Sequence, residues 1–146
     1  MATAARAIII EDKKMLLMHR NKNGKQYFTL VGGRVQDGEA PQQAMVREVK
    51  EETGLDVTAC RLVYLEEHAE PYNSQYIFVC EIASHGVVAI QDASEEALLN
   101  KISTNMHTPL WVDVASFSTL PFLTMNLQTI ITRDLKKGFP DLPERL

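Results

Sequence analysis

The stretch from Gly33 to Leu55 constrains this chain most strongly, because a pair of glycines precedes a helix rich in carboxylates. Gly32 and Gly33 close a strand-like run, and Glu39 and Pro41 then open the helix, whose first turn does not need the N–H that proline lacks. Gly54 can adopt the left-handed conformation that often ends helices. We therefore predict a strand that Gly32 and Gly33 close, a turn at Asp37 and Gly38, and a helix that ends at Gly54.

Three carboxylates of this helix share one face. At about 100° per residue, Glu48, Glu51 and Glu52 fall within an arc of roughly 100°. Like charges so placed repel at a cost of about a few tenths of a kcal/mol per pair, and only Arg47 and Lys50 are near enough in sequence to offset it. A hard divalent cation such as Mg²⁺, which takes oxygen ligands, would turn this repulsion into a net attraction. We expect removal of any one carboxylate to lower the rate of a reaction at this site by orders of magnitude with little loss of fold.

The helix composition alone leaves a second interpretation open. A helix rich in Glu, Lys and Arg is most often a solvated face, with Met45, Val46 and Val49 on the other side anchoring it to a core. The spacing favours a functional site instead. Five residues separate Gly33 from Glu39, and seven more precede the run REVKEETGL, which spans residues 47–55.

At every defined position this segment resembles the signature of the Nudix hydrolase family. The resemblance covers nearly the whole chain and implies an α/β fold, an α/β/α sandwich around a mixed sheet. It also implies a metal-dependent diphosphatase that uses Mg²⁺ or Mn²⁺. The substrate would be a nucleoside diphosphate linked to another moiety, such as ADP-ribose, a nucleotide sugar, a dinucleotide or a nucleoside triphosphate. Val31 is a departure, because the family commonly has proline before the glycine pair.

The resemblance also implies roles for individual residues. We expect a backbone carbonyl at Gly32 or Gly33 to assist the metal, and Arg47 to orient the carboxylates by pairing with Glu39. The expected metal ligands are Gly33, Glu48, Glu51, Glu52 and Glu96. The expected catalytic residues are Glu48, Arg47, Glu51 and Glu52, with Glu48 preferred as the general base and Glu95 or Glu96 as its rival.

Substrate contacts are expected from both glycines and from three longer side chains. Arg20 ends a strand and would bind phosphate oxygens in pairs, Tyr27 begins the strand before the glycines, and Tyr72 lies in a loop. Subgroups of the family carry markers near this loop. Pro71 resembles the marker of ADP-ribose diphosphatases and Tyr72 that of diadenosine polyphosphate hydrolases, so the pair decides neither.

Apolar alternation predicts the remaining elements. Strands are expected over residues 5–11 and 15–20, which form a hairpin, and over 27–31, 57–65, 75–82, 87–90 and 109–114. A final helix is expected over residues 123–136, with an apolar stripe that covers one face of the sheet. The six residues after Pro140 are expected to fray.

Size and charge limit the remaining possibilities. The 146 residues fit one domain, 1–146. A net charge of −4 without any basic block argues against a nucleic acid polymer as partner. No apolar run approaches membrane-spanning length, and the N-terminus lacks a signal-peptide pattern, so we expect a cytoplasmic protein with no membrane partner. Homodimers are frequent in the resembled family, which makes a homodimer an open alternative.

Two further functions compete with the diphosphatase. A Nudix domain can also sense such ligands without cleaving them, although the complete set of glutamates favours the enzyme. A Nudix-fold isomerase of prenyl diphosphates would need a catalytic cysteine in its pocket. Cys60 and Cys80 both lie in apolar strand-like runs, where we expect buried free thiols.

Overall fold

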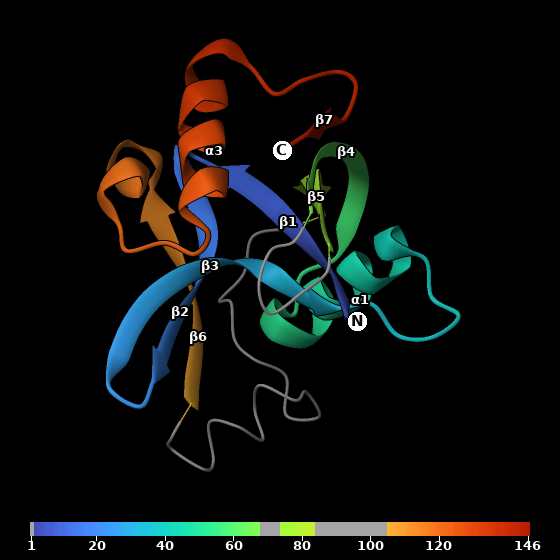
Figure 1. The fold of residues 1–146 in the computed structure, drawn as a ribbon, viewed down its shortest axis with the longest axis horizontal. Helices are drawn as coiled ribbons and strands as arrows, with labels where there is room; N and C mark the ends of the chain where they lie inside the picture. Colours follow the sequence, from blue (N-terminus) through green and yellow to red (C-terminus); the bar gives the residue numbers. More distant parts are fainter. Residues whose placement is uncertain (1, 68–73, 84–104) are drawn as a thin grey trace.

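The structure of the protein is a computed structural model that describes residues 2–67, 74–83 and 105–146. Its described strands form a seven-stranded mixed sheet in the order β6-β2-β3-β1-β5-β4-β7 (Figure 1). The elements are β1 (Thr3–Glu11), β2 (Lys14–Lys22), β3 (Lys25–Arg34), α1 (Pro41–Thr53), β4 (Val57–Glu67), β5 (Ser74–Ile82), β6 (Asn105–Asp113), the 3-10 helix η1 (Val114–Thr119), α3 (Met125–Lys137) and β7 (Glu144–Arg145). The strand expected over residues 87–90 lies outside the described residues.

β3 changes its pairing partner along its length. Its first part, through Leu30, pairs antiparallel with β2, and its last part, from Val31 to Arg34, pairs antiparallel with β1. β1 and β2 form the predicted hairpin, with Asp12 and Lys13 in the turn at φ 51° and 63°. The sheet therefore bends at the residues that lead into Gly32 and Gly33.

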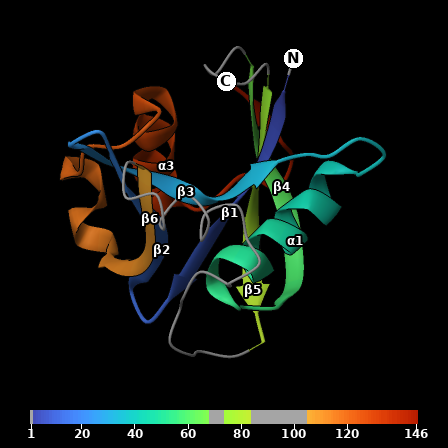
Figure 2. The same cartoon turned by 90° about the horizontal axis from the view of Figure 1, so that it is seen from below.

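The two long helices cover opposite faces of this sheet (Figure 2). On one face α1 contributes Ala44, Met45 and Val49 to a buried cluster with β1, β2 and β3. On the other face α3 contributes Leu127 and Ile131 to a second buried cluster. Alternate residues of each strand point to opposite faces, so both clusters draw on the same strands. The predicted α/β/α sandwich is confirmed.

The boundaries of α1 also follow the sequence. Pro41 is its first residue, and Gly54 follows its last with φ 79° and donates its N–H to Lys50 O at 2.9 Å. The expectation that Val46 anchors the helix is wrong, because Val46 is 36% exposed. Val46 lies outside the buried stripe, which runs through Ala44, Met45, Glu48, Val49, Glu52 and Thr53.

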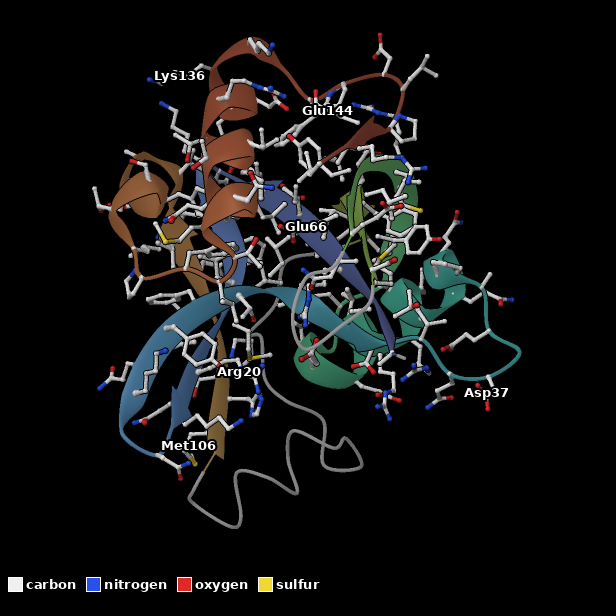
Figure 3. The ribbon with its side chains drawn as sticks, viewed as in Figure 1. Arg20, Asp37, Glu66, Met106, Lys136 and Glu144 are labelled. Carbon is white, nitrogen blue, oxygen red and sulfur yellow. The ribbon has the colours of Figure 1, made fainter. Side chains whose placement is uncertain are left out.

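The C-terminal residues are ordered against the sheet, which corrects the expectation that they fray. β7 pairs in parallel with β4, and Leu146 donates its N–H to Leu65 O at 2.9 Å. Glu144 lies beside α3 in Figure 3 and accepts hydrogen bonds from Arg133 at 3.0 Å. The tail pairs because β4 is an edge strand without it.

None of the helices in the described part of the chain has the length and apolar character needed to span a membrane.

A buried carboxylate on α3, Asp134, joins this helix to β4 through Tyr64. Asp134 is 1% exposed, accepts a hydrogen bond from Tyr64 Oη at 2.5 Å and pairs with Arg133 at 2.8 Å. The hydrogen bond from Arg133, assisted by that from Tyr64, lowers the pKa of Asp134 below its ordinary value. A lowered folded-state pKa stabilises the fold above the unfolded pKa, about 3.9, and this stabilisation is lost as pH falls through the folded value.

We therefore expect Asp134→Asn to lower the free energy of unfolding at pH 7 by about 1.5–3 kcal/mol, the usual range for hydrogen bonds to charged groups. The deficit should shrink below about pH 4, because protonation removes the same charge from the wild type. Urea unfolding at pH 7 and pH 3 measures both values. Asp56→Asn, at an exposed carboxylate, is the control, and an equal deficit at both pH values would contradict the assignment.

Candidate active site

We call residues 32–38 the glycine turn: Gly32 and Gly33 are paired residues at the end of β3, and the chain turns at Asp37 and Gly38, as predicted. This segment meets α1 through direct contact between Gly33 and Glu48. A Cβ atom added to Gly33 would lie 2.6 Å from Glu48 Cδ and 2.7 Å from its Oε2. Only glycine leaves room for the carboxylate to rest against the loop backbone. The contact places Glu48, which is 7% exposed, at the turn where the sequence predicts a metal ligand.

Gly32 is held between β1 and α1. Its φ of 138° lies in a region that favours glycine, and an added Cβ would lie 2.3 Å from Ala5 O. Its N–H donates to Glu52 Oε1 at 2.6 Å. Glu52, 2% exposed, therefore helps to fix the loop, which corrects the expectation that each carboxylate is only a repelling charge.

Arg47 holds the remaining carboxylates together. It pairs with Glu39 through two hydrogen bonds of 2.8 and 3.0 Å, as the sequence predicts. Its Nη1 donates to Glu48 at 3.0 Å and to Glu51 at 3.2 Å, and its Nη2 reaches Arg34 O at 3.0 Å. The hydrogen bond from Arg47, followed by that from the Gln36 N–H, lowers the pKa of Glu39 to about 2.

The three helical carboxylates differ in environment. Glu48 and Glu52 are buried, whereas the Glu51 side chain is 39% exposed. Within the described residues no three His, Cys, Asp or Glu side chains are grouped closely enough to form a cation site as they stand. Oxygens of Glu48 and Glu51 accept hydrogen bonds from Arg47, and Glu52 accepts one from the Gly32 N–H. The donor set nevertheless fits a hard divalent cation, because it offers carboxylate oxygens next to the backbone of Gly32 and Gly33.

Arg20 and Tyr27 face each other across β2 and β3, within one cross-strand pair. The Arg20 guanidinium carbon lies 5.6 Å from the centre of the Tyr27 ring, a distance at which a cation is attracted to the ring face. Arg20 is labelled in Figure 3 on the strand that borders the glycine strand. His19, the residue before Arg20, packs against Phe28, and the centres of the two rings are 5.0 Å apart.

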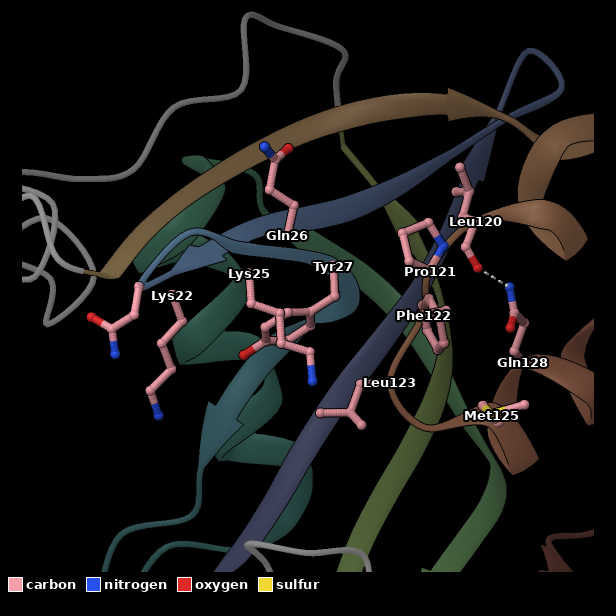
Figure 4. Close-up of a pocket in the computed structure, with 11 residues that line it drawn as sticks. Lys22, Lys25, Gln26, Tyr27, Leu120, Pro121, Phe122, Leu123, Met125 and Gln128 are labelled. Carbon is pink, nitrogen blue, oxygen red and sulfur yellow. Dashed lines mark hydrogen bonds between the residues drawn. The ribbon is translucent and has the colours of Figure 1, made fainter.

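Tyr27 also lines a pocket of about 600 Å³ between the β2–β3 turn and the segment that leads into α3 (Figure 4). Pro121 O accepts a hydrogen bond from Phe28 N at 2.7 Å, and Leu123 N donates to Phe28 O at 3.0 Å, so this segment is pinned to β3. The lining residues are Lys22, Asn23, Lys25, Gln26, Tyr27, Leu120, Pro121, Phe122, Leu123, Met125 and Gln128. The pocket combines aromatic and apolar side chains with two lysines and has a size typical of small-molecule sites.

The structure does not test every predicted residue. Tyr72, Pro71, Glu95 and Glu96 lie outside the described residues. The sequence prediction also missed Arg6, whose buried guanidinium reaches the backbone of Leu30 and Gly32. The signal was present, since an arginine interrupts an otherwise apolar strand.

The two cysteines are free, with Cys80 buried and Cys60 half-buried. Burial raises the pKa of both thiols above the ordinary value, and for Cys80 the nearby Cys60 adds to the effect. The nucleophilic thiolate is therefore disfavoured at both positions. This environment gives no support to the isomerase.

The chain also matches a known protein family, whose expected site residues are those described above. The family model of the NUDIX domain matches residues 1–133. The chain belongs to the Nudix family. The glycine turn and the helix that carries the carboxylates are the part of the chain whose sequence resembles the family signature, and in the structure they contact each other directly.

Known Nudix proteins differ in what their names say they act on. An ADP-ribose pyrophosphatase of Methanocaldococcus jannaschii is 37% identical over 99 residues, which cover 64% of this chain and 59% of that protein. An 8-oxo-dGTP diphosphatase of Proteus vulgaris is 42% identical over 45 residues, 31% of this chain and 40% of that protein. The matched parts thus cover less than two thirds of either relative.

A solved Nudix structure shows the same fold. The NUDIX hydrolase from Nitrosomonas europaea superposes with a TM-score of 0.67 at 21% sequence identity, covering 95% of this chain and 92% of that one. The fold class inferred from the sequence is thereby confirmed.

The contact between Glu52 and Gly32 predicts that two neighbouring glutamates differ in their effect on stability. Glu52→Ala leaves a buried N–H without its acceptor, which costs about 1–3 kcal/mol of unfolding free energy. Glu51→Ala should cost less than about 0.5 kcal/mol, because Glu51 is exposed and its ion pair is replaceable by water. Urea unfolding of both variants measures the difference, and equal losses would show that the Gly32 hydrogen bond does not hold the loop.

Proposed function

We propose that this Nudix domain, residues 1–146, hydrolyses a diphosphate linkage in a nucleoside diphosphate joined to another moiety, with Mg²⁺ or Mn²⁺ as cofactor. The observation that carries the proposal is the arrangement around the glycine turn. There α1 presents Glu48 and Glu52 directly to Gly33 and Gly32, while Arg47 holds Glu48 and Glu51 beside them.

The cation would be held by Glu48, Glu51 and Glu52 together with the backbone carbonyl of Gly32 or Gly33. When bound, it would neutralise charge on the diphosphate and make water easier to deprotonate. The room that Gly33 leaves for the Glu48 carboxylate supports this assignment, because a side chain there would push the carboxylate away from the loop. Glu96 is a further proposed ligand from outside the described residues.

We assign three further roles, those of general base, orienting residue and phosphate-binding residue, to individual side chains. Glu48 is proposed as the base that accepts the proton of the attacking water, which then forms a bond to phosphorus as the bridging oxygen leaves. Arg47 is proposed to keep the carboxylates oriented and not to touch substrate, since its donors already engage Glu39, Glu48 and Glu51. Arg20 would bind phosphate oxygens at the strand beside the glycines.

The pocket beside Tyr27 supports a substrate with a second bulky moiety. Tyr27 and Phe122 offer aromatic surface to a planar group, and the ammonium groups of Lys22 and Lys25 lie in the same lining. Gly32 lies five residues further along the extended strand than Tyr27, a span of about 16–17 Å. We propose that an elongated substrate lies along β3, with its diphosphate at the glycines and its far moiety in this pocket. The relatives named above act on different nucleotides, so the comparisons do not choose among such substrates.

We expect the protein to release phosphate-containing products from at least one of ADP-ribose, nucleotide sugars, dinucleotides and nucleoside triphosphates, only with Mg²⁺ or Mn²⁺ present. Glu51→Gln should lower kcat/KM about a hundredfold or more, as loss of one electrostatic group does in other active sites. Product analysis by chromatography measures this. Glu81→Gln, at an exposed position on β5, is the control and should retain wild-type activity.

Two results would contradict the diphosphatase. Turnover that Glu51→Gln leaves unchanged would move the reaction to another site. No turnover across the panel, combined with tight binding of one nucleotide in calorimetry, would assign the chain to the ligand-sensing class of Nudix domains.

Tyr27→Leu should raise KM about tenfold for substrates with a second bulky moiety, such as ADP-ribose, and leave kcat nearly unchanged. The reason is that stacking of a base on an aromatic ring contributes about 1–3 kcal/mol to the binding free energy. Tyr27→Phe keeps the ring and should retain most of the affinity. Steady-state kinetics of both variants test the pocket. If the two variants behave alike, aromatic stacking at residue 27 does not contribute to binding.

A further inference from the structure

Arg6 is a buried charge at a position where β1 would be expected to supply a core residue. It alternates with Ile8, which belongs to the cluster under α3, so its side chain points to the same face of the sheet. Arg6 is only 8% exposed. Burying a guanidinium costs free energy unless hydrogen bonds compensate it. The hydrogen bonds of Arg6 therefore indicate its structural role.

Those contacts converge on the point where β3 changes partner. Arg6 Nη1 donates to Leu30 O at 3.1 Å and also lies 3.5 Å from Gly32 O. Leu30 is the last β3 residue paired with β2, and Gly32 is paired with Arg6 itself on β1. The guanidinium thus binds carbonyls on both sides of the bend that leads into the glycine turn.

A second series of hydrogen bonds fixes the orientation of Arg6. Its Nε donates to Gln75 Oε1 at 2.7 Å, and Gln75 Nε2 donates to Glu66 Oε1 at 3.0 Å. Thr124, the N-cap residue of α3, donates through Oγ1 to Glu66 Oε2 at 2.7 Å. Gln75 and Glu66 are each 5% exposed, and Glu66 is labelled near the centre of Figure 3. This buried polar track connects the glycine turn to the start of α3.

Gly32 is consequently restrained on three sides. Glu52 accepts its N–H from α1, the β1 backbone fills the space where a Cβ would lie, and Arg6 lies at its carbonyl oxygen. Of these three restraints, Arg6 is the one that acts on the carbonyl.

We propose that Arg6 is a positioning residue that fixes the Gly32 carbonyl for cation binding, and that the track through Gln75, Glu66 and Thr124 sets the orientation of Arg6. The assignment rests on the proposed function. A carbonyl held in place before the cation arrives need not be reorganised when it binds, so loss of Arg6 should weaken cation affinity and slow turnover more than it weakens substrate binding.

The test uses the full chain and three variants. Arg6→Met removes the charge, Arg6→Lys keeps the charge without the fork of donors, and Gln75→Leu removes only the acceptor of Arg6 Nε. Amide hydrogen exchange of Gly32 in metal-free protein should accelerate about tenfold or more in Arg6→Met, with unchanged exchange in the β5 core. The Kd of Mn²⁺ alone, measured by calorimetry, should rise about tenfold. Arg6→Lys and Gln75→Leu should change both values in the same direction by smaller factors.

Arg61→Met is the matched control, because Arg61 is an exposed strand arginine whose Nε binds Pro140 O, away from the turn. Folded Arg6→Met and Gln75→Leu proteins with control values for Gly32 exchange and Mn²⁺ affinity would overturn the proposal. If Arg6→Met does not fold, Gln75→Leu decides alone.

The two proposals can fail separately. Mn²⁺ binding that weakens in the Arg6 variants, without turnover of any substrate, would leave the positioning role standing and refute the diphosphatase. Metal-dependent turnover with a kcat that is unchanged in the Arg6 variants would refute the positioning role alone. A rise in KM with constant kcat would make Arg6 a substrate-binding residue and also contradict positioning.

Discussion

Three negative charges on one helical turn can be kept beside a loop only if other groups bind their oxygens, and this constraint organises the structure. Arg47 supplies donors to Glu48 and Glu51, and the Gly32 N–H supplies one to Glu52. The Glu52–Gly32 contact, with the bond from Arg47 to Arg34 O, also joins α1 to β3. The helix and the glycine turn therefore hold each other, in addition to the apolar contacts of Ala44, Met45 and Val49 with the sheet.

The bend in β3 determines which side chains lie near the glycine turn and which lie near the pocket. Because the strand leaves β2 and joins β1, its first half lies beside Arg20 and its last half beside Arg6. One arginine contacts the Tyr27 ring at the pocket, and the other lies beneath the glycine backbone. A single strand thus connects the proposed subsite for a bulky moiety to the proposed cation site.

Sequence reasoning succeeded where neighbouring residues decide the outcome. Pro41 and Gly54 bound α1 as predicted, and the strands expected from β-prone runs in the described part of the chain are present, although β3 and β6 begin earlier than predicted. It failed at Val46, whose apolar character was taken as evidence of burial although the buried stripe of the helix passes beside it. It also failed at the C-terminus, where Glu144 and Arg145 pair with the open edge of β4. The sequence near the C-terminus gives no indication that the edge of β4 is available for pairing.

For the candidate site, the sequence by itself determined the glycine turn, the helix and three carboxylates on one face, because turn and helix geometry act over a few neighbouring residues. Only the tertiary structure decided which atoms meet. Gly32 binds Glu52 across 20 positions, and Arg6 binds Gln75 across 69. Such contacts depend on how the sheet bends and which strands adjoin, so the structural role of Glu52 and the whole network of Arg6 emerge only once the chain is folded.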